Sequence, residues 1–353
     1  TLFRSCARLI SGRLPGSLAQ TNIVANMLFG AISGSGTAAA AAIGGTMAPI
    51  ELEEGYDKDY VAAVNIASAP TGQLIPPSNT LIVYATVAGS VSVAALFMAG
   101  YIPGIAWGIS LMFIAGYMAK KRGYVSTFSV TPKEALKVLW DALPSLLLII
   151  IVIGGILKGV FTATEGSAIA VVYALILSLC YRSLKIKDLP SIILSSCKTT
   201  CIVIFMIGVS SIMSWVMAYT MIPTAIANAM LSLSSNKYVI LLLMNVILLV
   251  VGTFMDPTPA VLIFTPIFLP ICQSFGMDPV QFGIMIVFNL CIGTITPPVG
   301  VILFTGCKVV GISIEGVIKT LLPFFAAIAV VLLLVTYVPA MSMWIPSMLG
   351  LVK

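Results

Sequence analysis

The sequence contains no histidine and few charged residues. Asp, Glu, Lys and Arg together make up 8% of its 353 residues, whereas about a quarter of the residues in a soluble globular protein are charged. Without histidine the chain lacks the commonest general base, and a Cys/His metal site is excluded. It also lacks a Gly-Lys-Ser/Thr phosphate-binding loop, so it has no Walker-type ATP site. These absences argue against a soluble enzyme domain and against an ATP-driven pump.

Apolar runs dominate what is present: 59% of the residues are hydrophobic, and the mean hydropathy is +1.12. Runs of about 20 residues, long enough to cross a bilayer, recur along the chain. The net charge of +6 is spread over short loops between them, which is the positive-inside pattern and not a nucleic-acid footprint. The sequence predicts an all-α polytopic membrane protein surrounded by lipid bilayer, with four cytoplasmic basic loops. Their basic residues are Arg4, Arg8 and Arg13; Lys120, Lys121, Arg122, Lys133 and Lys137; Arg182, Lys185, Lys187 and Lys198; and Lys308 and Lys319.

The side of the membrane on which each segment begins and ends separates simple spans from hairpins. Residues 18–49 leave a cytoplasmic loop and must return to the same side, because residues 50–59 are strongly polar. Residues 238–275 must likewise begin and end outside. We expect both to be re-entrant helical hairpins with broken tips at 33–37 and 255–259, since non-helical backbone at membrane depth is tolerated where it faces protein or a wet cavity. The expected simple spans are 96–118, 143–161, 166–181, 199–221 and 321–340.

Two further segments are expected to be helices broken in the middle. Residues 60–90 contain a Pro-Pro pair at 76–77, and residues 281–307 contain one at 297–298. Each pair removes two backbone donors and pushes the preceding residue out of helical geometry. Nearby carbonyls therefore lose their helical partners, and such free oxygens suit a hard cation.

A displacement of 221 residues superimposes these unusual regions without a gap. The matched pairs are Thr37/Thr258, Pro49/Pro270, Gly55/Gly276, Asp57/Asp278, Gly72/Gly293, Pro76/Pro297 and Pro77/Pro298. Since the first hairpin opens inward and the second outward, the halves are predicted to be inverted repeats, a signature of secondary transporters. The predicted domains are an incomplete first repeat (1–119), a cytoplasmic linker (120–142) and a second repeat (143–353). Three spans precede the second hairpin, so the same displacement predicts about 80 further residues ahead of Thr1.

Seven short motifs follow one another along the chain. They are AISGSGTA (31–38), EGYD (54–57), LIPPS (74–78), FMAGYIPG (97–104), MDP (255–257), PIFLP (266–270) and GTITPPVG (293–300). Together they resemble the large membrane subunit of tripartite ATP-independent periplasmic (TRAP) transporters. The resemblance implies a sodium-driven elevator of the ion-transporter superfamily in the bacterial inner membrane. It also implies a small four-helix membrane subunit and a periplasmic substrate-binding protein as partners, and an organic-acid substrate such as a C4-dicarboxylate or sialic acid.

The first hairpin tip carries two hydroxyls, Ser33 and Ser35, opposite the first Pro-Pro break. Hydroxyl and carbonyl oxygens suit a hard cation such as Na+. We therefore expect a first sodium site formed by these serines and by carbonyls of Gly72, Ile75 and Pro77. The alternative is that small residues here only allow close helix packing, which is common in membranes.

Asp256 is the only acidic residue inside an apolar stretch, and it lies at the second tip. A carboxylate at membrane depth is costly unless it is paired or liganded. By the repeat, we expect a second sodium site in which Asp256 is joined by Gly293, Thr296 and Pro298. The alternative is a structural role, because Asp before Pro often caps a helix.

Polar side chains between the tips are the candidates for binding an anionic substrate, together with the positive ends of the half-helices that follow each break. Asp57 and Asp278, in the turns after the hairpins, are instead expected to be helix N-caps. The substrate candidates are Thr37, Ser78, Asn79, Thr80 and Thr258.

Other functions remain open at this point. A stand-alone carboxylate symporter of the same superfamily would need no binding protein. A proton could replace sodium, because Asp256 can titrate. An intramembrane enzyme would need a paired acid and base at depth, and Asp256 stands alone in its apolar stretch. A channel is also possible, although two opposed hairpins suit alternating access better.

Overall fold

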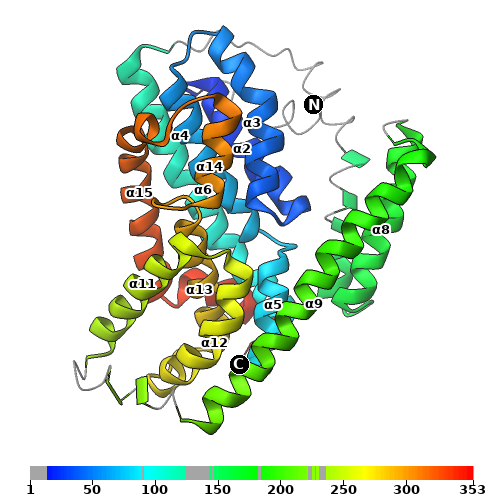
Figure 1. Cartoon of the computed structure of the whole chain (residues 1–353), viewed down its shortest axis with the longest axis vertical. Helices are drawn as coiled ribbons and strands as arrows, with labels where there is room; N and C mark the ends of the chain where they lie inside the picture. The colour runs from blue at the N-terminus through cyan, green and yellow to red at the C-terminus, as the bar shows by residue number, and fades with distance from the viewer. Residues whose placement is uncertain are drawn as a thin grey trace.

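The computed structural model describes residues 14–89, 91–124, 143–144, 147–148, 150–181, 184–221, 225–226, 228–229 and 236–352. Within these residues helices are the only regular secondary structure (Figure 1), which confirms the predicted all-α class. The described helical segments long and apolar enough to cross a membrane are Val93–Arg122, Ile186–Met213, Lys237–Phe254, Pro257–Ser274 and Ile314–Tyr337. Arg4, Arg8, Arg13, Lys133, Lys137, Arg182 and most of the predicted linker 120–142 lie outside the described residues.

The first half begins with a pair of helices interrupted where the sequence predicts a tip. Gly34 adopts left-handed backbone (φ +62°), which ends the first helix, and Ser35 caps the next one by accepting from the backbone N–H of Ala38. A second interruption falls at the Pro-Pro pair 76–77, after a short 3-10 helix. The elements are α2 (Ser17–Ser33), α3 (Gly36–Glu53), α4 (Lys58–Ser68), η1 (Ala69–Gln73), α5 (Asn79–Ala88) and α6 (Val93–Arg122).

The second half repeats this order of elements. Displaced by 221 residues, both ends of α3 fall on the ends of α12, and the first residues of α4 and α6 fall on those of α13 and α15. The chain then continues into a short helix, α16, that the sequence analysis did not predict. The elements are α11 (Lys237–Phe254), α12 (Pro257–Ser274), α13 (Pro279–Gly293), α14 (Val301–Val310), α15 (Ile314–Tyr337) and α16 (Ala340–Met348).

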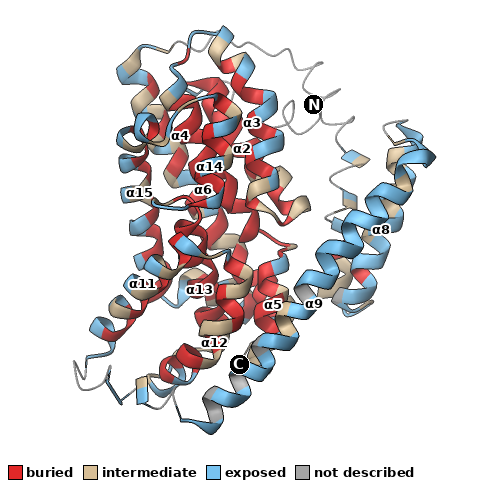
Figure 2. Ribbon diagram, viewed as in Figure 1, coloured by how far each residue is buried: buried red, intermediate tan, exposed pale blue. Residues whose placement is uncertain are grey.

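Two long helices between α6 and α11, α8 (Ala163–Cys180) and α9 (Leu189–Tyr219), lie along one side of the body (Figure 1). A short 3-10 helix, η2 (Ile186–Asp188), precedes α9, and the described part of 143–157 is helical. Most described side chains of α8 and α9 are exposed (Figure 2), although α9 contacts α12. Exposed apolar surface of this extent fits contact with lipid or with another membrane subunit.

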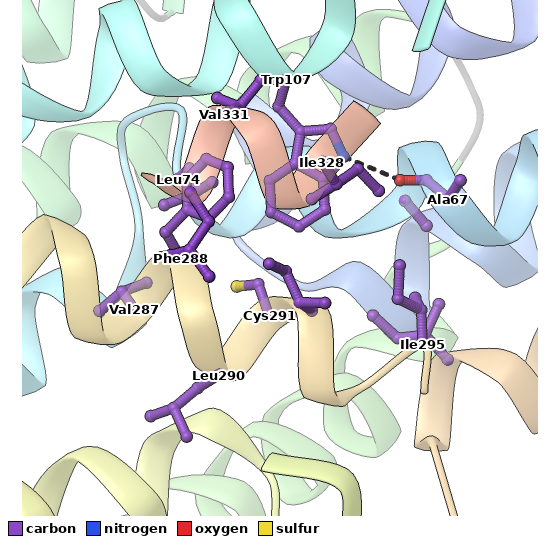
Figure 3. Packing of buried hydrophobic residues seen from close by; sticks show 14 of the residues in the cluster. Ala67, Leu74, Trp107, Val287, Phe288, Leu290, Cys291, Ile295, Ile328 and Val331 are labelled. Carbon is purple, nitrogen blue, oxygen red and sulfur yellow. Dashed lines mark hydrogen bonds between the residues drawn. The ribbon is translucent and has the colours of Figure 1, made fainter. Parts of the chain in front are cut away.

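Elements of both halves share one apolar core (Figure 3). The indole of Trp107 on α6 is fully buried, and its Nε1–H donates to the carbonyl of Ala67 on α4 at 3.0 Å. Its ring lies 4.5 Å from that of Phe288 on α13, measured between centroids. Trp107 is thus a packing residue that joins α13 of the second half to α4 and α6 of the first.

Candidate functional site

The first hairpin tip lies against the first helix break. A Cβ added to Gly34 would lie 3.3 Å from the carbonyl oxygen of Pro77, and one added to Gly30 would lie 2.2 Å from Cα of Gly72. At the second contact the backbones approach this closely only because both facing residues, Gly30 and Gly72, are glycines. Ser33 and Ser35, half-buried on either side of Gly34, therefore lie beside the carbonyl of Pro77, and Gly72 contacts α2 about one turn before Ser33.

Ile75, the fifth residue expected at this site, turns its side chain away from the tip. A Cβ added to Gly104 on α6 would lie 2.5 Å from Cγ1 of Ile75, so the isoleucine fills the contact between the break and α6. Its backbone N–H donates to the carbonyl of Thr71 at 3.0 Å. Ile75 thus shapes the break from behind, and only its carbonyl is a candidate ligand.

The second tip meets the second break in the corresponding way. A Cβ added to Gly293 would lie 2.3 Å from the carbonyl carbon of Gly252, and the N–H of Gly300 donates to the carbonyl of Thr253 at 3.2 Å. The hydroxyl of Thr296, in the break just after α13, donates to the carbonyl of Ile292 at 2.7 Å, so its oxygen can still accept from or coordinate another group.

Asp256 is exposed at this second tip, with Pro298 exposed in the adjacent break. Its Oδ1 accepts a hydrogen bond from the N–H of Thr258 at 3.1 Å, so the carboxylate caps α12. A carboxylate has about four lone-pair positions, and one backbone amide leaves most of them free. The capping role expected as an alternative is therefore compatible with the ligand role.

The residues proposed for substrate binding differ in how accessible they are. Asn79 is exposed, whereas Ser78 and Thr80 are buried. The hydroxyl of Ser78 donates to the carbonyl of Gln73 and accepts from the N–H of Leu81, so it caps α5. Thr37 is half-buried, with its Oγ1 3.1 Å from the Oγ of Ser35, and Thr258 is also half-buried.

A cavity of about 170 Å³ opens beside the first tip. Ser33, Pro77 and Asn79 line it from the tip and the break, and Phe97 lines it from α6. The opposite wall comes from the intervening helices, including Ser167 of α8. The cavity thus lies between the first tip and α8, with the polar side chains of Ser33 and Asn79 on one wall and that of Ser167 on the other, among mostly apolar neighbours.

The half-helices that follow the four interruptions begin close together. A Cβ added to Gly34, just before α3, would lie 3.5 Å from the backbone N of Asn79, where α5 begins. One added to Gly36 would lie 2.4 Å from Cδ1 of Ile302 at the start of α14. The bond from Gly300 to Thr253 brings the start of α14 to the second tip, where α12 begins. Several positive helix ends are therefore directed into one region.

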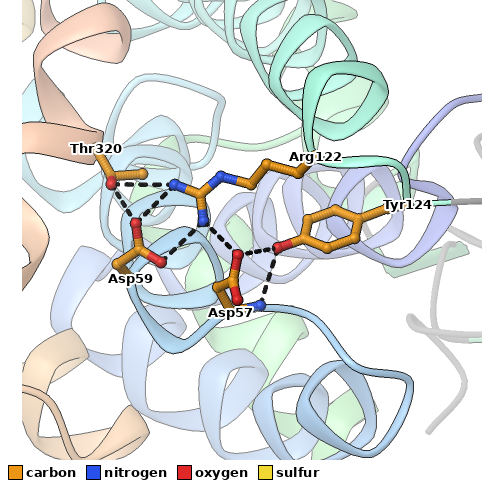
Figure 4. A network of polar contacts seen from close by, with 5 residues as sticks. All are labelled: Asp57, Asp59, Arg122, Tyr124 and Thr320. Carbon is orange, nitrogen blue, oxygen red and sulfur yellow. Dashed lines mark hydrogen bonds and ion pairs between the residues drawn. The ribbon is translucent and has the colours of Figure 1, made fainter.

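A charged network (Figure 4) lies just beyond the C-terminal end of α3, whose N-terminal end begins at the first tip. Arg122, at the end of α6, contacts Asp57 at 2.9 Å and Asp59 at 2.7 Å. Asp59 also accepts from Thr320 of α15, and Tyr124 donates to Asp57 at 2.7 Å. The hydrogen bonds from Arg122 outweigh burial and lower the pKa of Asp59 from 3.8 to about 2. The sequence analysis expected Arg122 only as one of the basic residues of a cytoplasmic loop, and its role in joining α4, α6 and α15 was missed.

The two predicted N-caps behave differently. Asp278 accepts from the N–H of Val280 at 2.7 Å and caps α13, as predicted. Asp57 occupies the N-cap position of α4, but its side chain makes no capping hydrogen bond. The prediction was wrong for this side chain, because Arg122 and Tyr124 compete successfully for the carboxylate.

A buried carboxyl group, Glu51, was also missed. The sequence analysis placed it in the polar segment 50–59, yet Glu51 is fully buried in the last turns of α3 and bonded to Asn22. Asn22 and Asn26 are one helical turn apart on α2, as are Asn65 and Ser68 on α4. Polar pairs at this spacing within apolar helices were the available signal that a polar cluster needed a partner.

Comparisons with known proteins agree with this architecture. The family model described as "Tripartite ATP-independent periplasmic transporter, DctM component" matches residues 1–341. The chain is similar to "Uncharacterized protein YgiK" of Salmonella typhimurium, with 54% identity over 97% of this chain and 79% of that protein. It is 37% identical to the C4-dicarboxylate TRAP transporter large permease protein DctM of Pseudomonas aeruginosa, over 96% and 80% of the two chains. It is 35% identical to the sialic acid TRAP transporter large permease protein SiaM of Vibrio cholerae, over 97% and 80%.

These matches cover nearly all of the chain, and the relatives named for a function are transporter permeases and not enzymes. They agree with the motifs, with the helices long enough to span a membrane, and with a place in the bacterial inner membrane. The chain is a non-enzymatic integral membrane protein, and it belongs to the DctM-component family, the large permeases of TRAP transporters.

Proposed function

We propose that this chain takes up an organic acid with the energy of a sodium gradient, as the large subunit of a TRAP transporter that works by an elevator-type movement. The observation that carries the proposal is the meeting of each hairpin tip with a helix break, through Gly34 and Pro77 in the first half and Thr253 and Gly300 in the second. This arrangement offers free oxygens for a cation and positive helix ends for an anion in one region.

The packing of the helices supports inverted, re-entrant halves. Each tip contacts the middle of a broken helix and not one of its ends, so it lies part-way along the path by which that helix crosses the membrane. The halves also exchange contacts reciprocally, because α3 packs against α14 and α12 packs against α5. Such an exchange is expected when a pseudo-two-fold axis relates two repeats, here 1–119 and 143–353.

Two sodium sites are proposed at these contacts. The first uses the hydroxyls of Ser33 and Ser35 with carbonyls of the break at 72–77, and the second uses the carboxylate of Asp256 with the break at 293–298. Both combine hard oxygen donors, which suit Na+. The second would bind more strongly, because its carboxylate supplies a full negative charge and the first site has only neutral ligands.

The substrate is proposed to be an organic acid that binds in the cavity beside the first tip. Two relatives are named for C4-dicarboxylate and sialic acid, and both substrates carry a carboxylate. Asn79 lines this cavity at the start of α5, which supports the proposal that its amide and this helix end bind such a group. Ser78 and Thr80, which are buried, would act by shaping this helix end. The family description implies a periplasmic binding protein and a second membrane subunit as partners, and the exposed helices α8 and α9 offer a surface for the latter.

The test is uptake into proteoliposomes that contain the full-length protein with its small subunit and binding protein. A panel of radiolabelled organic acids is tested with an inward sodium gradient, and again with choline replacing sodium at constant pH. We expect uptake of at least one acid only with sodium. Equal uptake in choline would overturn sodium coupling and favour a proton. Equal uptake without the binding protein would favour a stand-alone symporter.

A further inference from the structure

Glu51 lies in a packed polar cluster that the proposed transport sites do not use. Its carboxyl group is fully buried in the last turns of α3. The Nδ2 of Asn22 on α2 lies 3.4 and 3.3 Å from its two oxygens, at the long end of the range for a hydrogen bond. These long contacts to one neutral amide solvate a negative charge poorly. An ionised carboxylate in such a place is costly.

The rest of the cluster forms a chain of amides between α2 and α4. The Nδ2 of Asn26 contacts Oδ1 of Asn22 at 2.9 Å, Oδ1 of Asn65 at 3.2 Å and Oγ of Ser68 at 2.8 Å. Asn65 in turn donates to the carbonyl of Ala40 on α3 at 3.0 Å. The Oδ1 of Asn26 is buried and has no hydrogen-bond partner. The cluster therefore fixes Asn22, the partner of Glu51, and retains one unused acceptor.

No cation among the described residues compensates the charge of Glu51. The ion pairs found in the described part of the chain both involve Arg122, which is taken up by Asp57 and Asp59. The tyrosines Tyr56 and Tyr60 are near enough to interact electrostatically with Glu51, and both are uncharged at neutral pH. The other charged groups on α3, on the turn after it and on the helices packed against it are Glu53, Glu54, Asp57, Lys58, Asp59 and Lys308.

We propose that Glu51 is a proton-binding site: the seam between α2, α3 and α4 holds its carboxyl group in the neutral, protonated form. Burial raises the pKa of Glu51 from 4.5 to about 8, although the hydrogen bond from Asn22 opposes the change. Glu51 lies in the last turn of α3, just before the turn that leads to α4, and α3 is not among the described helices that are both long and apolar enough to span a membrane. Its proton is distinct from any ion bound at the hairpin tips, which lie at the opposite end of α3.

A proton fits this place better than a metal cation does. Asn22 presents an N–H donor to both carboxyl oxygens, and a donor hydrogen repels a cation at the same position. A proton needs no additional ligands and no free volume, whereas a bound alkali cation needs several oxygens around it. Among the described residues no group of three or more acidic or cysteine side chains gathers to hold a metal ion.

The test compares Glu51→Gln with Glu53→Gln in the purified full-length transporter. Glutamine imitates the protonated acid, and Glu53 is an exposed neighbour on the same helix. A folded-state pKa raised from 4.5 to about 8 gives stability that is complete below 4.5 and lost as the pH rises through about 8. We expect the Glu51→Gln protein to match the wild type at pH 5 and to exceed its Tm by about 2–5 °C at pH 9. The Glu53→Gln protein should follow the wild type at every pH.

A spectroscopic readout does not depend on stability. Infrared difference spectra between pH 5 and pH 9 should contain the C=O band of a buried protonated carboxylic acid in the wild type and in Glu53→Gln, but not in Glu51→Gln. A Glu51→Gln spectrum that still contained this band, like that of the wild type, would overturn the proposal. So would stabilisation at pH 9 by sodium or potassium chloride, relative to choline chloride, in the wild type but not in Glu51→Gln, which would indicate a cation site. None of these measurements requires transport, so they stand or fall separately from the proposed function.

Discussion

The two halves share a backbone plan, but different polar groups hold it together. In the first half the seam between α2, α3 and α4 contains Asn26 and the carboxyl group of Glu51. In the second half, Asn289 on α13 donates to Oδ1 of Asn245 on α11 at 2.7 Å, and Asn245 donates to Thr336 of α15 at 3.0 Å. The position equivalent to Glu51 is Cys272, which is buried. The repeat therefore preserves where helices meet, while each half satisfies its buried polar atoms with its own side chains.

This difference between a shared backbone and different polar side chains indicates which properties we expect to be the same in both halves. Steric requirements at the tips come from the backbone, so equivalent substitutions should have equal effects in both halves. Charge-dependent properties come from side chains that the repeat does not preserve, so they should differ. The predictions below begin with a symmetric effect and continue with asymmetric ones.

The largest expected effect is loss of folded protein in Gly72→Ala and, equally, in Gly293→Ala. The new Cβ would lie 2.1 Å from Cα of Gly30 in the first case and 2.3 Å from the carbonyl carbon of Gly252 in the second. These are contacts with backbone, which cannot rotate away, so the cost should reach or exceed about 3 kcal/mol. The yield of monodisperse protein and its Tm measure the effect.

The control for this pair is Gly45→Ala on α3, where an added Cβ meets no atom within 4 Å. Alanine favours a helix over glycine by about 1 kcal/mol, so this variant should be as stable as the wild type or slightly more so. A folded Gly293→Ala protein beside an unfolded Gly72→Ala protein would show that the two contacts are not equivalent.

The next effect concerns sodium and should be unequal between the tips. Asp256→Asn should raise the sodium concentration for half-maximal uptake by about tenfold or more, equivalent to about 1.4 kcal/mol, because a charged ligand is lost. Ser35→Ala should raise it by less, because a neutral ligand is lost. Sodium titrations of uptake in proteoliposomes measure both, with folding checked by Tm.

Asp278→Asn is the matched control, since it removes a carboxylate from a helix N-cap distant from the tips and asparagine caps a helix as well as aspartate does. Its sodium dependence should equal that of the wild type. Wild-type sodium affinity in Asp256→Asn would move the second ion site away from this tip.

The sequence was sufficient to locate interruptions but not side-chain partners. Gly, Pro and Ser determine backbone geometry locally, so the breaks at 33–37 and 76–77 and the 221-residue displacement were readable without a structure. The partners of Glu51 and Arg122 come from helices 29 and 63–65 residues away in the chain. Which carboxylate meets which donor is decided by packing over such distances. For this reason the sequence did not reveal that the polar segment 50–59 contains a buried acid, Glu51, and the acidic partners of Arg122.

A smaller effect is expected where Asp59 joins α4 to α6 and α15. Its pKa is lowered from 3.8 to about 2, mainly by hydrogen bonds from Arg122. The pairing therefore gives stability above pH 3.8 that is lost as the pH falls towards 2. Because the side chain is 27% exposed, Asp59→Asn should cost only about 1–2 kcal/mol at pH 7. Thermal unfolding at pH 7 and at the lowest pH the protein tolerates measures the difference, which should shrink in acid. A loss of stability that stayed constant with pH would contradict the charge-based explanation.

The smallest effects on stability are expected for substitutions of Asp57 and Asp278, which occupy the same position in the two repeats. Asp278→Ala should cost about 1 kcal/mol, because it removes the hydrogen bond that caps α13. Asp57→Ala should cost less than about 0.5 kcal/mol, because this side chain caps nothing, is 62% exposed, and leaves Arg122 still bound to Asp59. The backbone N–H of Asp57 would keep its bond to Tyr124 at 3.0 Å in this variant. Paired Tm measurements decide the order. If Asp57→Ala were the more damaging of the two, the first repeat would depend on its ion pairs more than on its packing.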